Sequence, residues 1–498
     1  MSLLRTKNIE SMLDVSEHDG LRKVLGPVDL VLMGIGAIIG TGIFVLTGTG
    51  ALTAGPALTV SFVIAAMACG FAALCYAEFA SAIPVSGSIY TYSYATLGEI
   101  VAWMIGWDLL LEYGLATSAV SVGWSGYFQS LLAGFGLHLP AAITAAPGSV
   151  PGVETLVNLP AILIMLAIAW VVSYGVRESA RLNNVMVAIK ITVVLLFIVV
   201  GVWHVKPANW QPFAPFGFTG IFNAAALVFF AFIGFDAVST AAQETKNPGK
   251  DMPIGILGSL VVCTVLYVLF AHVLSGVATV EDFRSSGREA SVAFAINKYM
   301  TGYGWLAKFV TVAILAGFSS VILVMLLGQS RVFYSMSRDG LVPKLFSETH
   351  PVYKTPYKSN MLFFVVTALF AAFIPGDIVG EMTSIGTLFA FLAPVFVALW
   401  LKFRHRKAVS NRIWLAIALT LVGLILVAHL WQGTTALDPE GVLAGLLCAA
   451  ALAGYWLLGE SGQRHRDPVS LTMWGFVFAS LAWAVISPWW SFPFDVLV

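Results

Sequence analysis

Residues 34–42 read GIGAIIGTG and interrupt the first long apolar segment of the chain. Apolar residues flank this run on both sides, Leu30 to Met33 before it and Ile43 to Leu46 after it. Glycine costs about 1 kcal/mol relative to alanine in a helix interior, so the run predicts a weak point in a helix. Unwound backbone at membrane depth is tolerated only where it is buried in protein or lines a cavity. The run therefore predicts a binding site near the middle of a membrane.

The composition indicates an integral membrane protein. Of the 498 residues, 59% are hydrophobic and 10% are charged, whereas soluble domains carry about 25% charged residues. The mean hydropathy is +0.88. A formal net charge of zero gives no support to a nucleic-acid partner. We expect no metal or cofactor, because the cysteines lie in apolar segments without metal-ligand spacing: Cys69, Cys75, Cys263 and Cys448.

Long apolar segments divide the chain into membrane helices, each of which needs roughly 20 apolar residues to cross the hydrocarbon core. Twelve segments meet this requirement, and a thirteenth at residues 469–489 is an alternative. The twelve lie near residues 28–50, 57–82, 98–132, 158–176, 183–203, 219–242, 254–278, 306–335, 360–375, 378–401, 413–431 and 441–459. The third is long for one crossing, so we expect it to tilt or to extend beyond the membrane.

The basic residues orient these helices with the N-terminus in the cytoplasm. Residues 1–26 form a mixed-charge segment before the first span and do not resemble a cleavable signal peptide. In this orientation most lysines and arginines between the spans lie inside, as the positive-inside rule requires. The basic residues that fall outside are Lys206, Arg284, Arg288, Lys298 and Lys308. Charge does not decide whether a thirteenth span places the C-terminus outside.

A second interruption lies in the sixth span, where residues 229–240 read FFAFIGFDAVST. An ordinary packing helix would explain Gly234 as a site of close helix approach and Asp236 as a group facing a partner helix. The position of the segment favours another interpretation. Spans one and six are five apart, an odd number, so two halves of five helices would be inverted relative to each other. Interrupted helices at matching positions of two such halves are typical of a transporter site.

Several motifs resemble one transporter family, in order and in topology. They are GIGAIIGTGIF at 34–44, YAE at 76–78, PVSGSIYTY at 84–92, GWDLLLEY at 106–113, GFD at 234–236, NP at 247–248, DMPIG at 251–255 and RDGLVP at 338–343. These motifs are similar to those of the bacterial cationic amino acid transporter family, within the amino acid–polyamine–organocation (APC) superfamily.

The resemblance implies an all-α polytopic membrane protein with a five-plus-five inverted repeat, the LeuT-like transporter fold, in which the first and sixth helices are broken. The implied divisions are a cytoplasmic segment at 1–26, a first repeat at 27–205, a second repeat at 206–405, and extra C-terminal helices at 406–498. Gln243-Glu244 departs from the family, which usually has two acidic residues there.

An amino acid zwitterion needs partners for its carboxylate and its ammonium when both lose water. Free N–H groups at a half-helix N-terminus suit the carboxylate, and unwound carbonyl groups suit the ammonium. The two breaks offer both kinds of group, and the resemblance assigns them the same roles. The expected carboxylate site is Ile38, Thr41 and Gly42, and the expected ammonium site is Phe230, Ala231 and Ile233.

Two further roles are left open near the second break. The resemblance implies that Phe230 covers the bound substrate as a gate, although packing in a core explains a phenylalanine equally well. Gly234 and Asp236 are candidates for the pocket that receives the substrate side chain.

Lys190 lies about eight residues into the predicted fifth span, roughly 12 Å beyond its cytoplasmic end at 1.5 Å per residue. A lysine there either snorkels to the interface or faces the bundle interior and exchanges protons. The resemblance favours the second interpretation, because in proton-coupled relatives a lysine on helix five replaces a sodium ion between helices one and eight. Ser319 and Ser320 match the hydroxyl positions of that sodium site and would accept hydrogen bonds from Lys190.

Glu112 lies near the middle of the third span, with Asp108 one turn away on the same face. A carboxylate at this depth is a functional candidate by default. Glu112 either shuttles a proton, holds a cationic side chain, or caps a buried hydroxyl network. Asp236 carries the same ambiguity.

The sequence therefore predicts a secondary active transporter in the cell membrane that imports L-amino acids by alternating access, coupled to protons and independent of sodium. An exchanger or a uniporter remains an alternative, and a polytopic membrane enzyme or a channel is an alternative of another class. The expected partners are an amino acid, protons and lipid, and the resemblance also allows a small single-span membrane partner. The substrate side chain, cationic or neutral, is left open.

Overall fold

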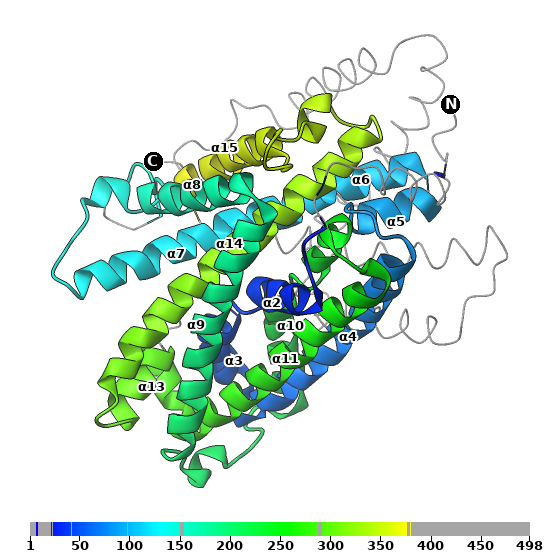
Figure 1. Ribbon diagram of the computed structural model, residues 1–498. Helices are drawn as coiled ribbons and strands as arrows, with labels where there is room; N and C mark the ends of the chain where they lie inside the picture. Colours follow the sequence, from blue (N-terminus) through cyan, green and yellow to red (C-terminus); the bar gives the residue numbers. More distant parts are fainter. Residues whose placement is uncertain are drawn as a thin grey trace, which may run out of the picture. The chain divides into compact units, whose positions relative to one another are not determined.

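Helices form every named element in the described part of the chain, as the sequence predicts. The computed structural model describes residues 6, 7, 21, 23–40, 42–96, 98–149, 154–286, 291–375 and 379. These residues belong to one compact unit, Ser2–Ala428. Figure 1 shows their helices. The predicted spans at 378–401, 413–431, 441–459 and 469–489 lie outside the described residues.

The first five spans are built from helices of unequal length, several of them divided into shorter elements. Pro27 begins the first helix, at a position where a helix does not need its N–H. The elements are α2 (Pro27–Ile38), η1 (Gly42–Leu46), α3 (Thr47–Ala54), η2 (Gly55–Ala57), α4 (Leu58–Ala82), α5 (Ile89–Thr96), α6 (Glu99–Leu110), η3 (Leu111–Leu115), α7 (Ala116–Ala133), η4 (Ala141–Ile143), α8 (Leu159–Tyr174) and α9 (Val176–Val202).

The next part of the chain follows the same pattern, with a second broken helix at its start. The elements are η5 (Pro207–Trp210), α10 (Gly217–Phe229), η6 (Phe230–Phe232), η7 (Asp236–Glu244), α11 (Pro248–Val277), α12 (Val280–Ser286), α13 (Ser291–Tyr299), α14 (Gly304–Arg338), η8 (Lys344–Ser347) and α15 (Tyr357–Phe373). The short helices α5, α12 and α13 lie between predicted spans and were not anticipated by the apolar pattern.

Apolar helices of membrane-spanning length confirm the membrane class. Among the described residues, five helical stretches are long and apolar enough to cross a membrane. They are Thr47–Ala82, Val176–Val202, Gly217–Glu244, Pro248–Val277 and Gly304–Arg338. Shorter apolar helices are Pro27–Ile38, Leu159–Tyr174 and Tyr357–Phe373. The chain is therefore a polytopic helical membrane protein over this part.

Two predicted spans differ in detail from the helices observed. The fifth span was predicted to begin at residue 183, but α9 begins at Val176. The prediction missed the first two turns of this helix because they are polar, and an apolar pattern does not reveal a polar helical segment. The third span is continuous from Glu99 to Ala133 and contains the π-helical turn η3. Single π-helical turns occur frequently at functional sites, and η3 carries Glu112.

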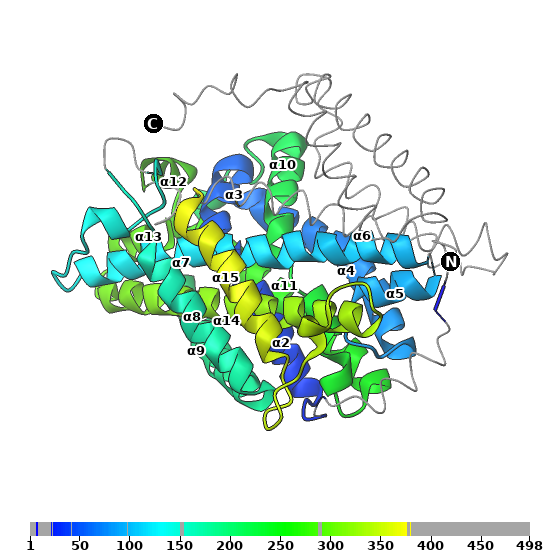
Figure 2. The ribbon, with the colours of Figure 1, turned by 90° about the horizontal axis from the view of Figure 1, so that it is seen from above.

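The first helix lies inside the bundle. α2 contacts α9, α11 and α14, and Figure 1 shows these helices around it. The view from above in Figure 2 shows α15 beside α8, a pair that is also in contact. Because α2 is surrounded, the irregular backbone at its C-terminal end is shielded from lipid, as backbone without helical hydrogen bonds requires.

Candidate functional site

The first helix breaks where the glycine run predicted. α2 ends at Ile38, Ile39 and Gly40 form a bend, and a π-helical turn begins at Gly42. Ile39 has an extended backbone conformation (φ −76°, ψ 96°). Thr41, predicted to bind the substrate carboxylate, lies outside the described residues. The predicted interruption of the first span is thus confirmed.

The second helix breaks between η6 and η7. Ile233 leaves the helical conformation with ψ 140°, and Gly234 has φ +113°, a backbone angle that residues other than glycine rarely adopt. A Cβ atom at Gly234 would also lie 2.8 Å from the Cβ of Ala37 on α2. Gly234 is therefore fixed both by its backbone conformation and by the close approach of α2.

The two breaks meet each other through Gly42 and Ala231. A Cβ atom at Gly42 would lie 2.4 Å from the Cβ atom and 2.8 Å from the Cα atom of Ala231. Only a residue without a side chain fits between these two backbones. The unwound parts of the first and sixth spans, far apart in sequence, therefore lie directly against one another.

Tyr267 on α11 links both breaks. Its hydroxyl oxygen lies 2.8 Å from the carbonyl oxygen of Ile38 and 3.0 Å from that of Ala231, so its single O–H proton is shared between these two carbonyls. The Tyr267 side chain is fully buried. The sequence gives no signal for this residue, because it is one of many aromatic side chains in apolar segments. Its importance follows from its position between two broken helices.

The amide of Ile38 belongs to α2, whereas its carbonyl accepts from Tyr267. In the second break the carbonyl of Phe230 accepts from the amide of Ile233 at 3.3 Å. The ring of Phe230 is half-buried at the end of α10. These predicted contact groups are thus gathered in one place, next to Gly42 and Ala231.

Lys190 faces the bundle interior and does not snorkel. Its side chain is fully buried, and its Nζ donates to the carbonyl oxygens of Gly36 at 3.0 Å and Ile39 at 2.8 Å. A third hydrogen bond of 2.8 Å runs to Ser320 Oγ on α14. An ammonium group has three N–H donors, so these partners satisfy it completely.

The two predicted serines separate in the structure. Ser320 accepts from Lys190, and its single O–H proton lies within reach of the carbonyl oxygens of Gly36 at 2.8 Å and Gly317 at 2.7 Å. Ser319 donates instead to the carbonyl of Leu315, one turn back on its own helix. The junction of α2, α9 and α14 is therefore built from Lys190, Ser320 and backbone carbonyl groups.

A cluster of buried acids and tyrosines lies beside the second break. Tyr113 donates a short hydrogen bond to Asp236 Oδ2. Glu112 is 1% exposed, and neither of its oxygens has a hydrogen-bond partner among the described residues. Asp108 is 8% exposed. Tyr113 is a functional candidate that the sequence did not single out, because its contact with Asp236 depends on the tertiary fold.

Ion pairs close one end of the bundle. Arg331 on α14 binds Glu244 at 3.0 Å, and both side chains are fully buried. The Glu244 carbonyl also accepts from the amides of Val24 and Leu25, at 2.8 and 2.9 Å. Lys7 forms an ion pair with Asp339, which also accepts from the Tyr90 hydroxyl at 2.8 Å. These contacts connect the segment before α2 to η7 and to the C-terminal end of α14.

Side chains suited to a metal ion do not gather in the part of the chain described. No group of three or more His, Cys, Asp or Glu side chains lies close enough there to hold a metal ion. The groups that remain as candidates are the two backbone breaks, the buried Lys190, and the buried carboxyl groups of Asp108, Glu112 and Asp236.

Comparisons with known proteins agree with this architecture. A family model described as amino acid permease matches residues 25–438. The branched-chain amino acid permease BcaP of Bacillus subtilis is 56% identical over 392 residues, which cover 78% of this chain and 83% of that protein. The methylthioribose transporter of the same organism is 50% identical over 405 residues, covering 81% and 86%. Cationic amino acid transporter 4, vacuolar, of Arabidopsis thaliana is 36% identical over 412 residues, covering 81% and 67%. The chain therefore belongs to the amino acid permease family and is a transporter rather than an enzyme.

Proposed function

We propose that this protein imports neutral, branched-chain L-amino acids across the cell membrane by alternating access, coupled to protons and independent of sodium. The contact between the two helix breaks at Gly42 and Ala231 is the observation that carries the proposal. Two interrupted helices in contact gather backbone donors and acceptors within the bundle, and these groups match the two charged ends of an amino acid.

The substrate carboxylate binds at the start of η1, where the amides of Thr41 and Gly42 precede a helical segment. The positive end of that segment favours an anion. The ammonium binds at the carbonyls of Phe230, Ala231 and Ile233. A carbonyl oxygen has two lone pairs, so Ala231 accepts from Tyr267 and from the ammonium together. Ile38 contributes to the shape of the site, with its carbonyl held by Tyr267.

A neutral substrate side chain fits the surroundings of the second break better than a cationic one. Asp236, two residues after Gly234, already accepts a hydrogen bond from Tyr113. The relative that is 56% identical is named a branched-chain amino acid permease. The relatives named cationic amino acid transporters are 34–36% identical. Both observations support valine, leucine and isoleucine.

Lys190 is the proposed proton-coupling group. Its ammonium bridges α2, α9 and α14 at a position where a sodium ion would otherwise supply the positive charge. When the proton leaves, the charge-assisted hydrogen bonds to Gly36 and Ile39 weaken, and the end of α2 is released. Glu112, buried without a partner among the described residues, is a second candidate for proton exchange.

The proposed topology places the N-terminus and the Arg331–Glu244 pair on the cytoplasmic side, because the loops there are rich in lysine and arginine. Residues 27–205 and 206–405 form the two inverted repeats of five helices. Residues 406–498 are assigned to extra C-terminal helices.

Uptake into proteoliposomes tests the proposal. Purified protein is reconstituted without sodium, and labelled leucine, isoleucine, valine, lysine, arginine and methylthioribose are compared with and without an acidic exterior. We expect saturable uptake of the branched-chain amino acids. The pH gradient should stimulate this uptake, and a protonophore should abolish the stimulation. Linear flux would indicate a pore. A requirement for sodium, a preference for lysine and arginine, or transport of methylthioribose alone would contradict the proposal.

A further inference from the structure

The turn between α8 and α9 ends an exposed apolar face of the bundle. α8 ends at Tyr174 and α9 begins at Val176, so Gly175 alone connects the two helices. Large exposed side chains recur on α8 at intervals of three and four residues, which places them on one face of the helix. They are Leu159, Leu163, Leu166, Trp170 and Tyr174. This face is aliphatic over most of its length and ends in two aromatic rings at the turn.

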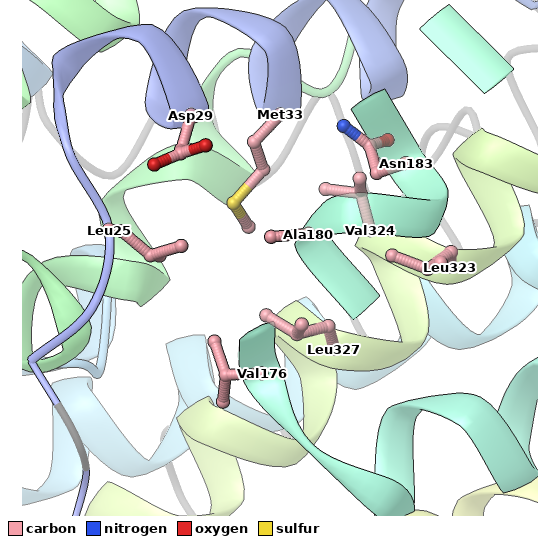
Figure 3. Close-up of a pocket in the computed structure, with 9 residues that line it drawn as sticks. All are labelled: Leu25, Asp29, Met33, Val176, Ala180, Asn183, Leu323, Val324 and Leu327. Carbon is pink, nitrogen blue, oxygen red and sulfur yellow. The ribbon is translucent and has the colours of Figure 1, made fainter. Parts of the chain in front are cut away.

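Two arginines lie on the exposed face of α9, directly after the turn. The inner face of α9 is different, because Val176, Ala180 and Asn183 line a cavity with side chains of α2 and α14, as Figure 3 shows. Arg177 and Arg181 each follow a lining residue by one position, about 100° around the helix, and both are exposed. The exposed face continues along α9 with apolar side chains, Val185, Ile189, Leu195, Val199 and Val202. The arginines, one helical turn apart, therefore stand at the end of an apolar stripe.

Aromatic rings mark the level of this turn in the membrane. Trp170 and Tyr174 are 66% and 47% exposed, and their ring centroids lie 5.9 Å apart. Tyr353, in the loop before α15, packs on Tyr174 with 4.5 Å between the ring centroids. Tryptophan and tyrosine gather at the level of the lipid headgroups, where the ring contacts apolar chains and the polar tip meets water. The arginines that follow are therefore at headgroup level.

Acidic side chains near the turn do not pair with the arginines. Neither Arg177 nor Arg181 forms an ion pair with another described residue. Glu178 folds back on the turn, where its Oε2 would lie 2.3 Å from a Cβ atom at Gly175 and faces the positive end of α9. Asp29, on the inner side of α9, accepts from a side-chain amide and a backbone amide. Two guanidinium groups are thus left to bind an anion.

Hydrogen bonds hold the backbone of the turn in place. Ser179 Oγ lies 2.7 Å from the carbonyl oxygen of Gly175 and 3.3 Å from that of Val171. The Thr355 hydroxyl donates to the carbonyl of Ser173 at 2.7 Å and connects the turn to the loop before α15. Because the backbone that carries the arginines is fixed, binding an anion costs conformational entropy mainly in the two side chains.

We propose that the turn between α8 and α9 binds the phosphate of an anionic glycerophospholipid, with Arg177 and Arg181 as its ligands. The planar guanidinium group binds phosphate oxygens through paired hydrogen bonds. The acyl chains of the lipid lie along the apolar stripes of α8 and α9. Both stripes end at the turn, so a headgroup phosphate reaches the arginines from within the membrane, without exchange from water.

The proposed topology agrees with this ligand. It places the turn on the cytoplasmic side, where anionic lipids attract basic residues close to the membrane surface. The inference rests on the proposed function for this placement alone. Substrate choice and proton coupling do not enter it, and its test measures lipid binding without transport. Failure of leucine uptake and failure of lipid binding are therefore separate results.

Thermal unfolding of the full chain in detergent tests the inference, because a ligand that binds the folded state raises its stability. Phosphatidylglycerol, phosphatidylcholine with the same acyl chains, and glycerol 3-phosphate are added separately. We expect phosphatidylglycerol to raise the unfolding temperature by about 2–4 °C, and the other two to leave it nearly unchanged. An equal shift with phosphatidylcholine would contradict recognition of charge. An equal shift with glycerol 3-phosphate would assign the site to a dissolved anion and overturn the proposed lipid.

Substitution of both arginines locates the effect. Arg177→Gln/Arg181→Gln removes the two charges and keeps good helix formers on an exposed face. Lys246→Gln/Lys250→Gln is the matched control, because it removes two exposed lysines, four residues apart, at the start of α11. We expect the shift with phosphatidylglycerol to disappear in the arginine variant and to keep its wild-type size in the lysine variant. Equal shifts in the two variants would overturn the inference.

Two further measurements keep the inference testable if the glutamine variant does not fold. Arg177→Lys/Arg181→Lys keeps the charges but replaces each planar fork with a point charge. We expect a smaller shift than in the wild type, and a shift of wild-type size would show that the guanidinium groups are not the ligands. Native mass spectrometry should also find a bound phosphatidylglycerol in the wild type and the lysine control that the arginine variants lose. The same lipid count in all of these proteins would contradict a site at this turn.

Discussion

The Lys190 ammonium donates a 2.8 Å hydrogen bond to the carbonyl of Ile39, the residue that caps the C-terminal end of α2. A buried charge on α9 therefore holds the backbone of the first break. Because charge-assisted hydrogen bonds are roughly twice as strong as neutral ones, the charge of Lys190 and the geometry of the break depend on each other. Proton coupling requires such a dependence between a titratable group and a mobile element.

Lys190→Met should uncouple transport from protons. Methionine has a similar length but provides no donor for the carbonyls of Gly36 and Ile39. We expect leucine uptake driven by a pH gradient to fall to the level seen without a gradient, while leucine–leucine exchange continues. Uptake and exchange in the same proteoliposomes measure the two activities. A gradient response of wild-type size in this variant would exclude Lys190 as the coupling group.

Gly42→Ala should abolish transport. The added Cβ would lie 2.4 Å from the Cβ of Ala231, well inside contact distance, and the backbone of Ala231 leaves little freedom to adjust. We expect saturable uptake to fall to background as the two breaks are forced apart. Gly126→Ala on α7 is the matched control, because a Cβ there has no neighbour within 4 Å. Gly126→Ala should transport normally; normal uptake by Gly42→Ala would show that the breaks need not touch.

Tyr267→Phe should weaken substrate binding and the fold together. The change removes the hydroxyl that lies between the carbonyls of Ile38 and Ala231. Leaving buried polar groups without a partner costs about 1–3 kcal/mol. We expect a higher KM for leucine and a lower unfolding temperature, measured by uptake kinetics and thermal unfolding. Tyr174→Phe is the control, since Tyr174 is 47% exposed. An unchanged KM in Tyr267→Phe would remove Tyr267 from the site.

The sequence predicts the backbone of this site better than its side-chain contacts. A cluster of glycines marks the break at residues 39–40, and a single glycine close to a carboxylate marks the break at residues 233–235, because glycine weakens helices wherever it occurs. Lys190 is also identified, since a buried lysine is costly and stands out in an apolar span. Both signals are local, so they do not depend on knowing which helices pack together.

Contacts between distant helices are not visible in the sequence. Ser319 and Ser320 are adjacent, yet on a helix they point about 100° apart, and the sequence does not tell which one faces Lys190. Tyr113 and Tyr267 resemble other buried aromatic residues until the fold brings them to Asp236 and to the breaks. The polar start of α9 was likewise missed, because apolar content locates the membrane part of a helix and not its ends.

Breaking the Arg331–Glu244 pair should destabilise the protein more than removing both partners. Both side chains are fully buried, so a single substitution leaves one charge without a partner. Such a loss costs about 3–5 kcal/mol, whereas apolar replacement of both groups is often tolerated. We expect Arg331→Met and Glu244→Met each to lower the unfolding temperature, and the double variant to recover most of it. Additive losses in this double-mutant cycle would show that the two charges do not interact.

Asp282→Asn should lower stability at neutral pH but not in acid. Burial alone would raise the pKa of Asp282, but hydrogen bonds from Lys298, Tyr299 and Thr279 outweigh it and hold the pKa well below its usual value. A carboxyl whose pKa is lower in the folded state stabilises the fold above its unfolded pKa of about 3.9, and this contribution is lost as the pH falls through the folded pKa. We expect the variant to unfold about 2–4 °C below the wild type at pH 7.

That difference should shrink as the pH falls below about 4, because the carboxyl of the unfolded wild type then takes up a proton, and it should vanish once the pH falls below the lower pKa of the folded state. Thermal unfolding in detergent at pH 7 and at acidic pH measures both differences. Glu281→Gln is the control, since the neighbouring Glu281 side chain is 74% exposed and pairs with Arg284, which is 63% exposed. Salt and solvent screen such a pair, so its removal should leave the unfolding temperature nearly unchanged at either pH. If Asp282→Asn and Glu281→Gln had the same unfolding temperature at pH 7, the hydrogen bonds of Asp282 to Lys298 and Tyr299 on α13 would not contribute to stability.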